Sequence, residues 1–235
     1  MAEAVTEANF VRPENWISPF QAGDKESIRL EIERIGAKSC LEFGPGESTQ
    51  ALIELGLERI VTLEHIPKWL AVAKKRFAKH KHVRVGAFTD TVPVVAELDD
   101  DEWFDIAFVD TPKGNGLRKV HPEFPDCARL NACLAALHHT DVVLLHDATR
   151  PLERATLGRL NSAGYKITFI LDNRFGMARI ERSEKSHRPD RKSPPKLRSV
   201  AAGPKPKRRG KPVVKRPDRR DDSGPGGEGD NPTHD

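Results

Sequence analysis

Two groups of residues in this 235-residue chain have types and spacing that suit chemistry. The first group is the turn Gly44-Pro45-Gly46, together with Glu64, which follows twenty residues after Gly44. Glycines let the backbone turn sharply and let a ligand approach without meeting a Cβ atom. An acidic side chain at that distance suits hydrogen bonds from both hydroxyls of a ribose. The pair therefore predicts a site for a ribose-bearing cofactor.

A nicotinamide dinucleotide is an alternative occupant of the same turn. Domains that bind it carry a third glycine, in the pattern G-x-G-x-x-G, where the pyrophosphate meets the helix end. Thr49 stands at that third position. This counts against an NAD(P)-dependent oxidoreductase but leaves it as an alternative. A plain turn followed by a solvated strand-end charge is the other explanation.

The second group consists of polar residues that directly follow apolar runs. Asp110 ends "FDIAFVD", and His146 and Asp147 end "DVVLLHD". Carboxylates bind hard divalent cations, and a histidine beside one can act as a general base or a metal ligand. These three residues are the predicted catalytic residues, and Asp110 and Asp147 are the predicted metal ligands.

The elements that must position these residues follow from the apolar pattern. Strands are predicted over 39–43, 59–64, 82–86, 104–110 and 141–147. Helices are predicted from a cap at Asp24 to Gly36, and over 47–55, 67–79, 91–98, 126–138 and 150–164. Alternating strands and helices indicate a parallel sheet covered on both faces. Ligands of such sheets bind beyond the carboxyl ends of the strands, so both groups of residues are expected at one rim.

The chain differs at its last two strand-like runs, "YKITFIL" and "GMARIER". Only residues 172–175 separate these runs. Four residues cannot hold a crossover helix, so the two strands must be antiparallel.

Two stretches of the chain resemble motifs of a known family. "LEFGPGEST" followed by "VTLEH" is similar to motif I and the acidic second-strand end of class I S-adenosylmethionine-dependent methyltransferases. The resemblance runs over residues 38–181. It implies an α/β, Rossmann-like, seven-stranded, mostly parallel sheet with helices on both faces and its last strand inserted antiparallel. The implied cofactor is S-adenosyl-L-methionine.

The resemblance also implies roles for single residues. Glu42, Gly44 and Gly46 would surround the methionine portion, and Glu64 would bind the ribose. His65 or Ile66 would pack on the adenine. The implied cofactor site is completed by Ser48 in the turn and by Phe88, Thr89 and Asp90 near the adenine amine.

On the acceptor side, Asp110 and Asp147 resemble the metal-binding aspartates of catechol-type O-methyltransferases. That family has Asp-Asn at the second site, whereas Ala148 stands here, so a requirement for Mg²⁺ stays open. "VDTPKG" with "HDATR" is also similar to glucuronoxylan-type O-methyltransferases. The implied function is O-methylation of a small-molecule or saccharide acceptor.

Charge and composition divide the chain into three parts. Residues 1–22 form an N-terminal segment in which Trp16 and Phe20 could act as a lid, and 23–182 form the predicted methyltransferase domain. Residues 183–235 carry fifteen Lys or Arg, eight Asp or Glu, nine prolines and no aromatic residue. Such a segment is expected to be disordered. Its basic stretch 204–220 is suited to binding nucleic acid or an anionic surface through counterion release, and a soluble extended appendage is the other explanation. A nucleic-acid-binding protein that acts through this tail is the third alternative.

The N-terminus shows no signal peptide, and no apolar run approaches the length of a membrane span. Cys40, Cys127 and Cys133 lack the spacing of metal ligands, and sparse cysteines suit a reducing compartment. We therefore expect a cytoplasmic protein. The sequence gives no indication of oligomeric state.

Overall fold

The computed structural model describes residues 20, 22–89, 95–111, 127, 129–171 and 176–183. Trp16, Asp90 and the basic stretch 204–220 lie outside the described residues. The roles expected for them stay predictions.

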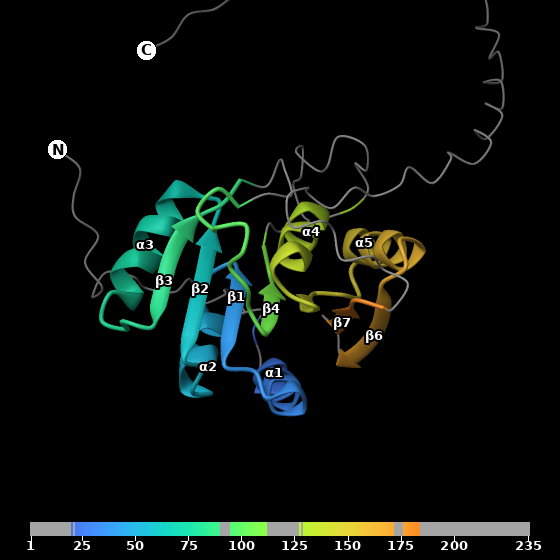
Figure 1. The fold of residues 1–235 in the computed structure, drawn as a ribbon, viewed down its shortest axis with the longest axis horizontal. Helices are drawn as coiled ribbons and strands as arrows, with labels where there is room; N and C mark the ends of the chain where they lie inside the picture. The colour runs from blue at the N-terminus through green and yellow to red at the C-terminus, as the bar shows by residue number, and fades with distance from the viewer. Residues whose placement is uncertain are drawn as a thin grey trace, which may run out of the picture. The chain divides into compact units, whose positions relative to one another are not determined.

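Five helices and seven strands make up the described part of the chain (Figure 1). The strands are β1 (Ser39–Phe43), β2 (Arg59–Glu64), β3 (Val83–Ala87), β4 (Ile106–Val109), β5 (Val142–His146), β6 (Lys166–Leu171) and β7 (Met177–Glu181). The helices are α1 (Ala22–Ile35), α2 (Glu47–Glu54), α3 (Pro67–Phe77), α4 (Leu130–His139) and α5 (Pro151–Ser162). Pro67 and Pro151 begin their helices at the position where the missing N–H costs nothing.

The strands form one sheet in the order β3-β2-β1-β4-β5-β7-β6. The pairs among β1 to β5 are parallel, whereas β7 runs antiparallel to both β5 and β6. The predicted fold class is confirmed, including the last strand inserted between β5 and β6. The strand order reverses beside β1, because β2 pairs with one side of it and β4 with the other. This is the switch point at which ligands bind in such sheets.

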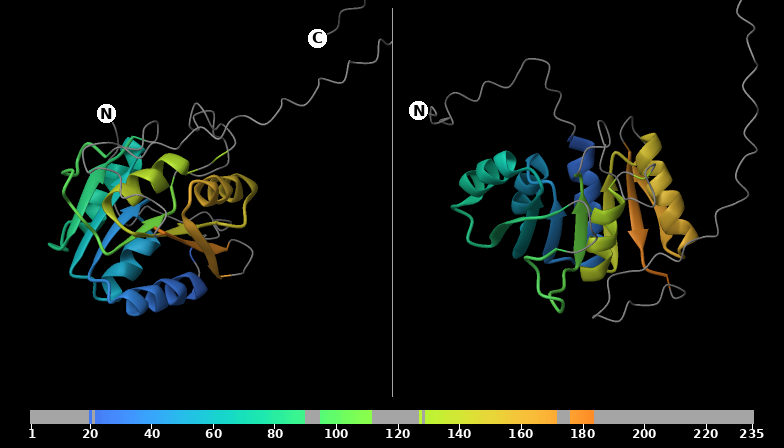
Figure 2. Two further views of the ribbon diagram at one scale, coloured as in Figure 1. Left: turned by 45° about the vertical axis from the view of Figure 1, so that its right-hand side comes forward. Right: turned by 90° about the horizontal axis from the view of Figure 1, so that it is seen from above.

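Alternate residues of each central strand enter two separate hydrophobic clusters, one on each face of the sheet. Cys40 packs in a cluster with Ile28 of α1 and Leu52 of α2. Leu41 packs in the other cluster, which includes Leu134 of α4 and many further apolar residues of α4 and α5. The helices therefore cover both faces (Figure 2), and buried strands of this kind read as apolar runs.

Three local predictions differ from the structure. Asp24 does not cap α1, since the helix begins at Ala22 and Asp24 is buried within its first turn. The helix predicted over 126–138 begins at Leu130, because Arg129 before it adopts φ 60°. Val95–Leu98, the described part of the helix predicted over 91–98, forms a turn closed by a hydrogen bond from Leu98 N to Val95 O.

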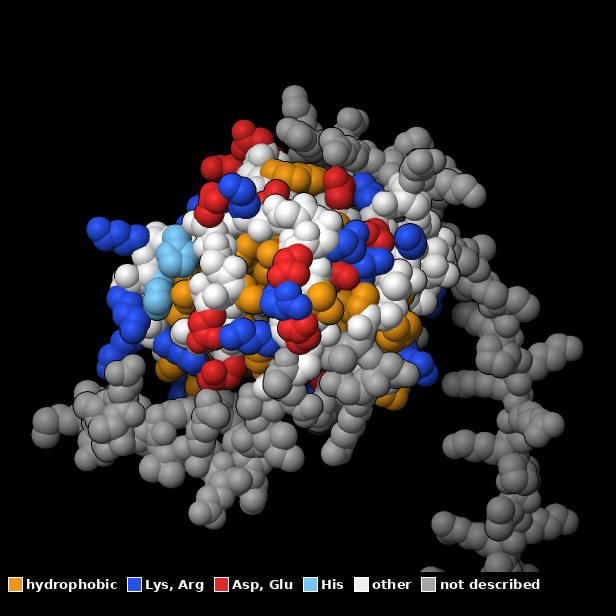
Figure 3. All heavy atoms as spheres, turned by 90° about the horizontal axis from the view of Figure 1, so that it is seen from below, with side chains coloured by type: hydrophobic (Ala, Val, Ile, Leu, Met, Phe, Trp, Pro, Cys, Tyr) orange, Lys and Arg blue, Asp and Glu red, His pale blue; other side chains and the backbone are white. Residues whose placement is uncertain are grey.

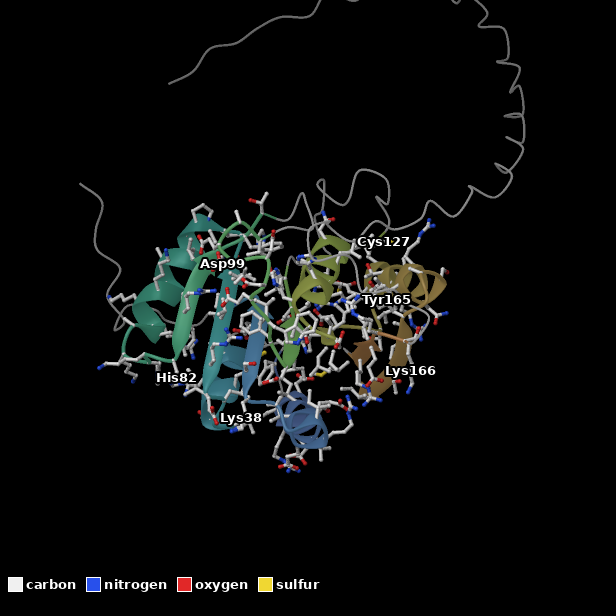
Figure 4. All side chains as sticks on the ribbon, viewed as in Figure 1. Lys38, His82, Asp99, Cys127, Tyr165 and Lys166 are labelled. Atoms are coloured by element: carbon white, nitrogen blue, oxygen red, sulfur yellow. The ribbon has the colours of Figure 1, made fainter. Side chains whose placement is uncertain are left out.

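The amino ends of the strands carry paired surface charges. Lys38 pairs with Glu58, and Arg84 pairs with Glu102. Acidic and basic side chains are interspersed on the face seen in Figure 3. Lys38 and His82 lie at this end of the sheet, whereas Cys127 lies near α4 toward the other end (Figure 4).

Candidate functional site

The turn after β1 requires glycine at its first position. Gly44 has φ 104°, and its N–H donates to Leu63 O of β2 at 2.9 Å. A Cβ atom at Gly44 would lie 3.1 Å from Cβ of Thr111. At Gly46, the residue before α2, a Cβ atom would meet nothing within 4 Å among the described residues. Gly44 therefore fixes the turn, and Gly46 borders open space.

The buried carboxyl of Glu42 is linked to this turn by hydrogen bonds. Glu42 of β1 accepts hydrogen bonds of 2.5 Å from Ser48 Oγ and from Thr49 Oγ1. Thr49 Oγ1 in turn accepts the N–H of Gly46 at 2.9 Å. Burial raises the pKa of the Glu42 carboxyl to about 7, although the two hydroxyl hydrogen bonds act in the opposite direction. Glu42 is therefore a titrating group at neutral pH, joined to the start of α2 by two hydroxyls.

Glu64 ends β2 beside the turn, and its carboxylate is fixed on one side only. Its Oε1 accepts the backbone N–H groups of His65 at 2.8 Å and Ile66 at 2.9 Å. Its other oxygen makes no hydrogen bond with the described residues. Next to it, the apolar side chain of Ile66 is 40% exposed. A carboxylate oxygen and an exposed apolar side chain thus lie together at this edge.

Phe88 packs against the same region from the core side. Its ring meets Phe43 edge-on, with centroids 5.0 Å apart, and His65 at 6.2 Å. His65 Nδ1 also lies 3.1 Å from Thr111 Oγ1. Phe88 is buried, so in this arrangement it supports His65.

His146, the last residue of β5, lies between a carboxylate that follows β4 and a carboxylate of α1. His146 Nδ1 is 3.0 Å from Asp110 Oδ1, and its Nε2 is 3.3 Å from Asp24 Oδ2 of α1. Burial lowers the pKa of the imidazole, but the interactions with Asp110 and Asp24 outweigh it and raise that pKa to about 10. The two flanking carboxylates therefore favour the imidazolium form of His146 at neutral pH.

Arg129 is the second buried cation of this cluster. Its side chain has no solvent exposure, and Nη2 lies 2.8 Å from Asp147 Oδ2 and 3.2 Å from Asp110 Oδ1. Its Nη1 donates to the backbone oxygen of His146 at 2.7 Å, and Nε lies 3.6 Å from Glu153 Oε1. Burial lowers the pKa of the guanidinium, but the surrounding carboxylates outweigh it and raise that pKa. A buried charge of this kind is stable only when it is paired in this way.

The same cluster contains the predicted metal ligands. Asp110, His146 and Asp147 each offer a ligand atom, and these atoms lie within 4.8 Å of one another. However, Arg129 Nη2 already contacts one carboxylate oxygen of Asp110 and one of Asp147. A divalent cation between these two aspartates would compete with the guanidinium, so the donor set in this arrangement does not fit a resident metal ion.

Comparison with known proteins adds the following. No family model and no curated protein matches the sequence. Among solved structures, the chain is similar to a provisionally assigned caffeoyl-CoA O-methyltransferase from Staphylococcus aureus, with a TM-score of 0.54 and 14% identity over 70% of this chain and 85% of that one. The chain has the class I methyltransferase fold. It is also similar to an O-methyltransferase from Bacillus cereus in complex with SAH, with a TM-score of 0.49 and 16% identity over 69% of this chain and 82% of that one.

Within this class I methyltransferase fold, the predicted site residues that the structure describes lie at the carboxyl ends of the strands, in the loops that follow or, for Ser48, in the first turn of α2. They form two groups. The cofactor group consists of Glu42, Gly44, Gly46, Ser48, Glu64, His65 and Phe88, and the acceptor group of Asp110, His146 and Asp147. Gly44 and Asp110 lie against each other, since Asp110 C is 3.4 Å from the Cβ position of Gly44. The roles assigned to these residues remain predictions.

The structure adds three residues that were not predicted to belong to the site. In the sequence Thr49 stands out only because it replaces a third glycine, yet its hydroxyl is hydrogen-bonded to both Glu42 and Gly46. The sequence predicts Asp24 as a helix cap, yet its carboxylate faces His146. Arg129 had one usable signal, since it directly precedes the mostly apolar segment "LNACLAALHH", where a charged side chain needs a buried partner.

Proposed function

We propose that this chain is an S-adenosylmethionine-dependent methyltransferase that methylates an oxygen of a small-molecule or saccharide acceptor. One observation carries the proposal: the glycine turn and the Glu64 carboxylate end the two strands that pair beside the switch point. One oxygen of that carboxylate makes no hydrogen bond with the described residues. Phe43 of β1 is in register with Leu63 of β2, so Gly44 and Glu64, the residues that directly follow this pair, lie side by side.

The cofactor end of the proposal uses four features of the chain. Open space borders Gly46, where the backbone can approach the methionine portion. The Glu42 carboxyl lies beneath the turn and suits the amino group of that portion. The second oxygen of Glu64 suits the ribose hydroxyls, and the exposed side chain of Ile66 suits the adenine ring.

The chemical step asks little of the protein. S-adenosylmethionine supplies a methyl group that is already activated. The chain must therefore align the acceptor for in-line attack and receive one proton. Asp110 is the residue of the acceptor group that reaches solvent, with its side chain 20% exposed. It is placed to accept a hydrogen bond from the acceptor hydroxyl. His146 and Arg129 fix its position through their contacts with its Oδ1.

Calorimetry with S-adenosylhomocysteine tests the cofactor. We expect the full chain to bind it, and Glu64→Ala to abolish binding because the ribose loses its acceptor. Glu58→Ala is the matched control, since Glu58 is an exposed glutamate at the opposite end of the sheet. Absence of binding by the wild-type chain would refute the proposal, and a thermal shift with NAD or NADP would favour the oxidoreductase in its place.

Incubation with S-adenosylmethionine that carries a labelled methyl group tests the acceptor class. Phenols, saccharides and RNA are the three arms. Label transfer to a phenol or a saccharide supports the oxygen acceptor proposed here. Transfer to RNA bases alone would contradict it.

A further inference from the structure

The buried guanidinium of Arg129 lies between the two aspartates at which the resemblance implies a divalent cation. We propose that Arg129 is the resident cation of this site, and that the acceptor is held by a hydrogen bond to Asp110, without chelation by a metal. The statement about the acceptor rests on the proposed function. The statement about the cation rests on the geometry alone.

The contacts of Arg129 reproduce what a bridging ion would do. One nitrogen, Nη2, is 2.8 Å from Asp147 and 3.2 Å from Asp110, so a single positive centre links the ends of β4 and β5. The second nitrogen, Nη1, donates to the backbone oxygen of His146. A planar guanidinium can make such contacts in fixed directions, which an ammonium cannot.

Both predicted metal-binding aspartates already contact an arginine. Arg129 Nη2 lies 2.8 Å from Asp147 Oδ2 and 3.2 Å from Asp110 Oδ1, and its Nε lies 3.6 Å from Glu153 Oε1. Arg150 adds a second positive group, 2.9 Å from Asp147 Oδ2. A divalent ion would enter beside these cations and would need to displace a fully buried side chain.

The sequence also lacks one metal ligand of the catechol-type pattern. Ala148 stands where that pattern has a metal-binding asparagine, and its side chain is fully buried in the hydrophobic cluster. The site therefore lacks one metal ligand of the catechol-type pattern and contains the guanidinium of Arg129. Either change alone would be compatible with a metal ion, but together they favour a site that has no metal.

This arrangement restricts the acceptor. A metal ion recognises two neighbouring oxygens by chelation, whereas a hydrogen bond to Asp110 needs only one O–H donor. Asp147 is buried, so Asp110 is the aspartate that an acceptor can reach. Its Oδ1 already contacts His146 and Arg129. The proposal therefore removes the need for a vicinal diol in the acceptor.

Electron paramagnetic resonance of Mn²⁺ tests the proposal on the full chain without any substrate. We expect the signal of free aqueous Mn²⁺ to persist when wild-type protein is added at millimolar Mn²⁺. Binding by the wild type that Asp110→Asn abolishes would overturn the inference. This result is read separately from S-adenosylhomocysteine calorimetry, so failure of the proposed function leaves it interpretable.

Arg129→Met supplies the converse experiment, because it removes the cation and keeps the apolar stem. A folded Arg129→Met protein is expected to acquire Mn²⁺ binding at Asp110 and Asp147, because both aspartates lose their contact with the guanidinium. If it folds and binds no Mn²⁺, the aspartates are no cation site and the inference is wrong. Arg84→Met is the matched control, since Arg84 pairs with Glu102 at the opposite end and should leave Mn²⁺ binding absent. If Arg129→Met does not fold, the measurement of Mn²⁺ binding by the wild-type protein still tests the proposal.

Discussion

At the scale of the residue, the two glycines of the turn perform separate tasks. Gly44 combines a positive φ with a close approach to Thr111, whereas Gly46 has an extended backbone and open space beside it. Both belong to the stretch Gly44-Pro45-Gly46, and the sequence alone does not distinguish their roles. The structure therefore separates a glycine that the fold needs, Gly44, from one that borders open space, Gly46, where the proposed function places the cofactor.

This difference predicts opposite outcomes for two alanine substitutions. Gly44→Ala forces a Cβ atom into the left-handed region and against Thr111, and should cost about 2 kcal/mol or more of stability. Gly46→Ala should leave stability nearly unchanged but weaken binding of S-adenosylhomocysteine, because its Cβ enters the open space. Chemical denaturation and calorimetry measure the two effects. Equal loss of stability in both variants would contradict the distinction.

The Glu42 carboxyl predicts a pH dependence of cofactor binding. Its pKa of about 7 means that it gains negative charge as the pH rises through neutrality, and a carboxylate attracts the positive amino group of the cofactor. Affinity for S-adenosylhomocysteine should therefore rise with pH up to about 7 and then level, by up to about tenfold per pH unit. Calorimetry between mildly acidic and mildly basic pH measures it.

Glu42→Gln is the control for that profile, because the amide keeps the hydrogen-bonding shape and cannot ionise. We expect its affinity to be weaker and nearly independent of pH in this range. A profile that stays unchanged in Glu42→Gln would assign the titration to another group.

At the scale of the element, α1 is held to the sheet by ion pairs as well as by its apolar face. Asp24 meets His146 of β5, Glu31 meets Arg179 of β7 at 2.7 Å, and Arg34 approaches Glu181 of the same strand at 3.1 Å. The apolar periodicity of this helix was visible in the sequence. Its charged contacts were not, because they join residues more than a hundred positions apart.

The tie between α1 and β5 predicts that stability declines at high pH. Asp24, Asp110 and Asp147 surround His146, with Arg129 beside them, and the folded-state pKa of about 10 exceeds the ordinary value of 6.5. A group with a raised pKa contributes full stability below its unfolded pKa and loses it as the pH approaches the folded one. The free energy of unfolding should therefore fall between about pH 6.5 and about 10.

Urea denaturation across this range measures the effect, and His146→Gln should remove most of the decline. His82→Gln is the matched control, because His82 lies at the opposite end of the sheet. A decline of the same size in the wild type and in His146→Gln would show that another group is responsible.

The elements and the site were predictable from the sequence to different degrees. Buried strands such as β4 and β5 appear as short apolar runs, and the four residues between the last two strands exclude a crossover helix. Both are local properties, so the sheet could be predicted. The partners of Arg129 depend on where β4, β5 and α5 meet in space, and nothing local in the sequence specifies that. The glycine turn and Glu64 were found because a fixed spacing links them.

At the scale of the whole molecule, the charge is unevenly distributed along the chain. The net charge is +4, but residues 183–235 carry fifteen basic and eight acidic residues, so residues 1–182 are acidic overall. Among the described residues, no helix combines the length and the apolar character needed to cross a membrane. The basic excess therefore resides outside the sheet and its site.

This separation predicts two independent activities. Removal of residues 184–235 should leave the affinity for S-adenosylhomocysteine unchanged, because the cofactor group lies between Glu42 and Phe88. Any affinity for single-stranded RNA should disappear on the same removal, and in the full chain it should fall steeply with salt as counterions are released. Glu64→Ala should have the opposite pattern, with RNA affinity kept and cofactor binding lost. Calorimetry and fluorescence anisotropy measure the two affinities, and RNA binding that survives the truncation would locate the nucleic-acid site on the folded part instead.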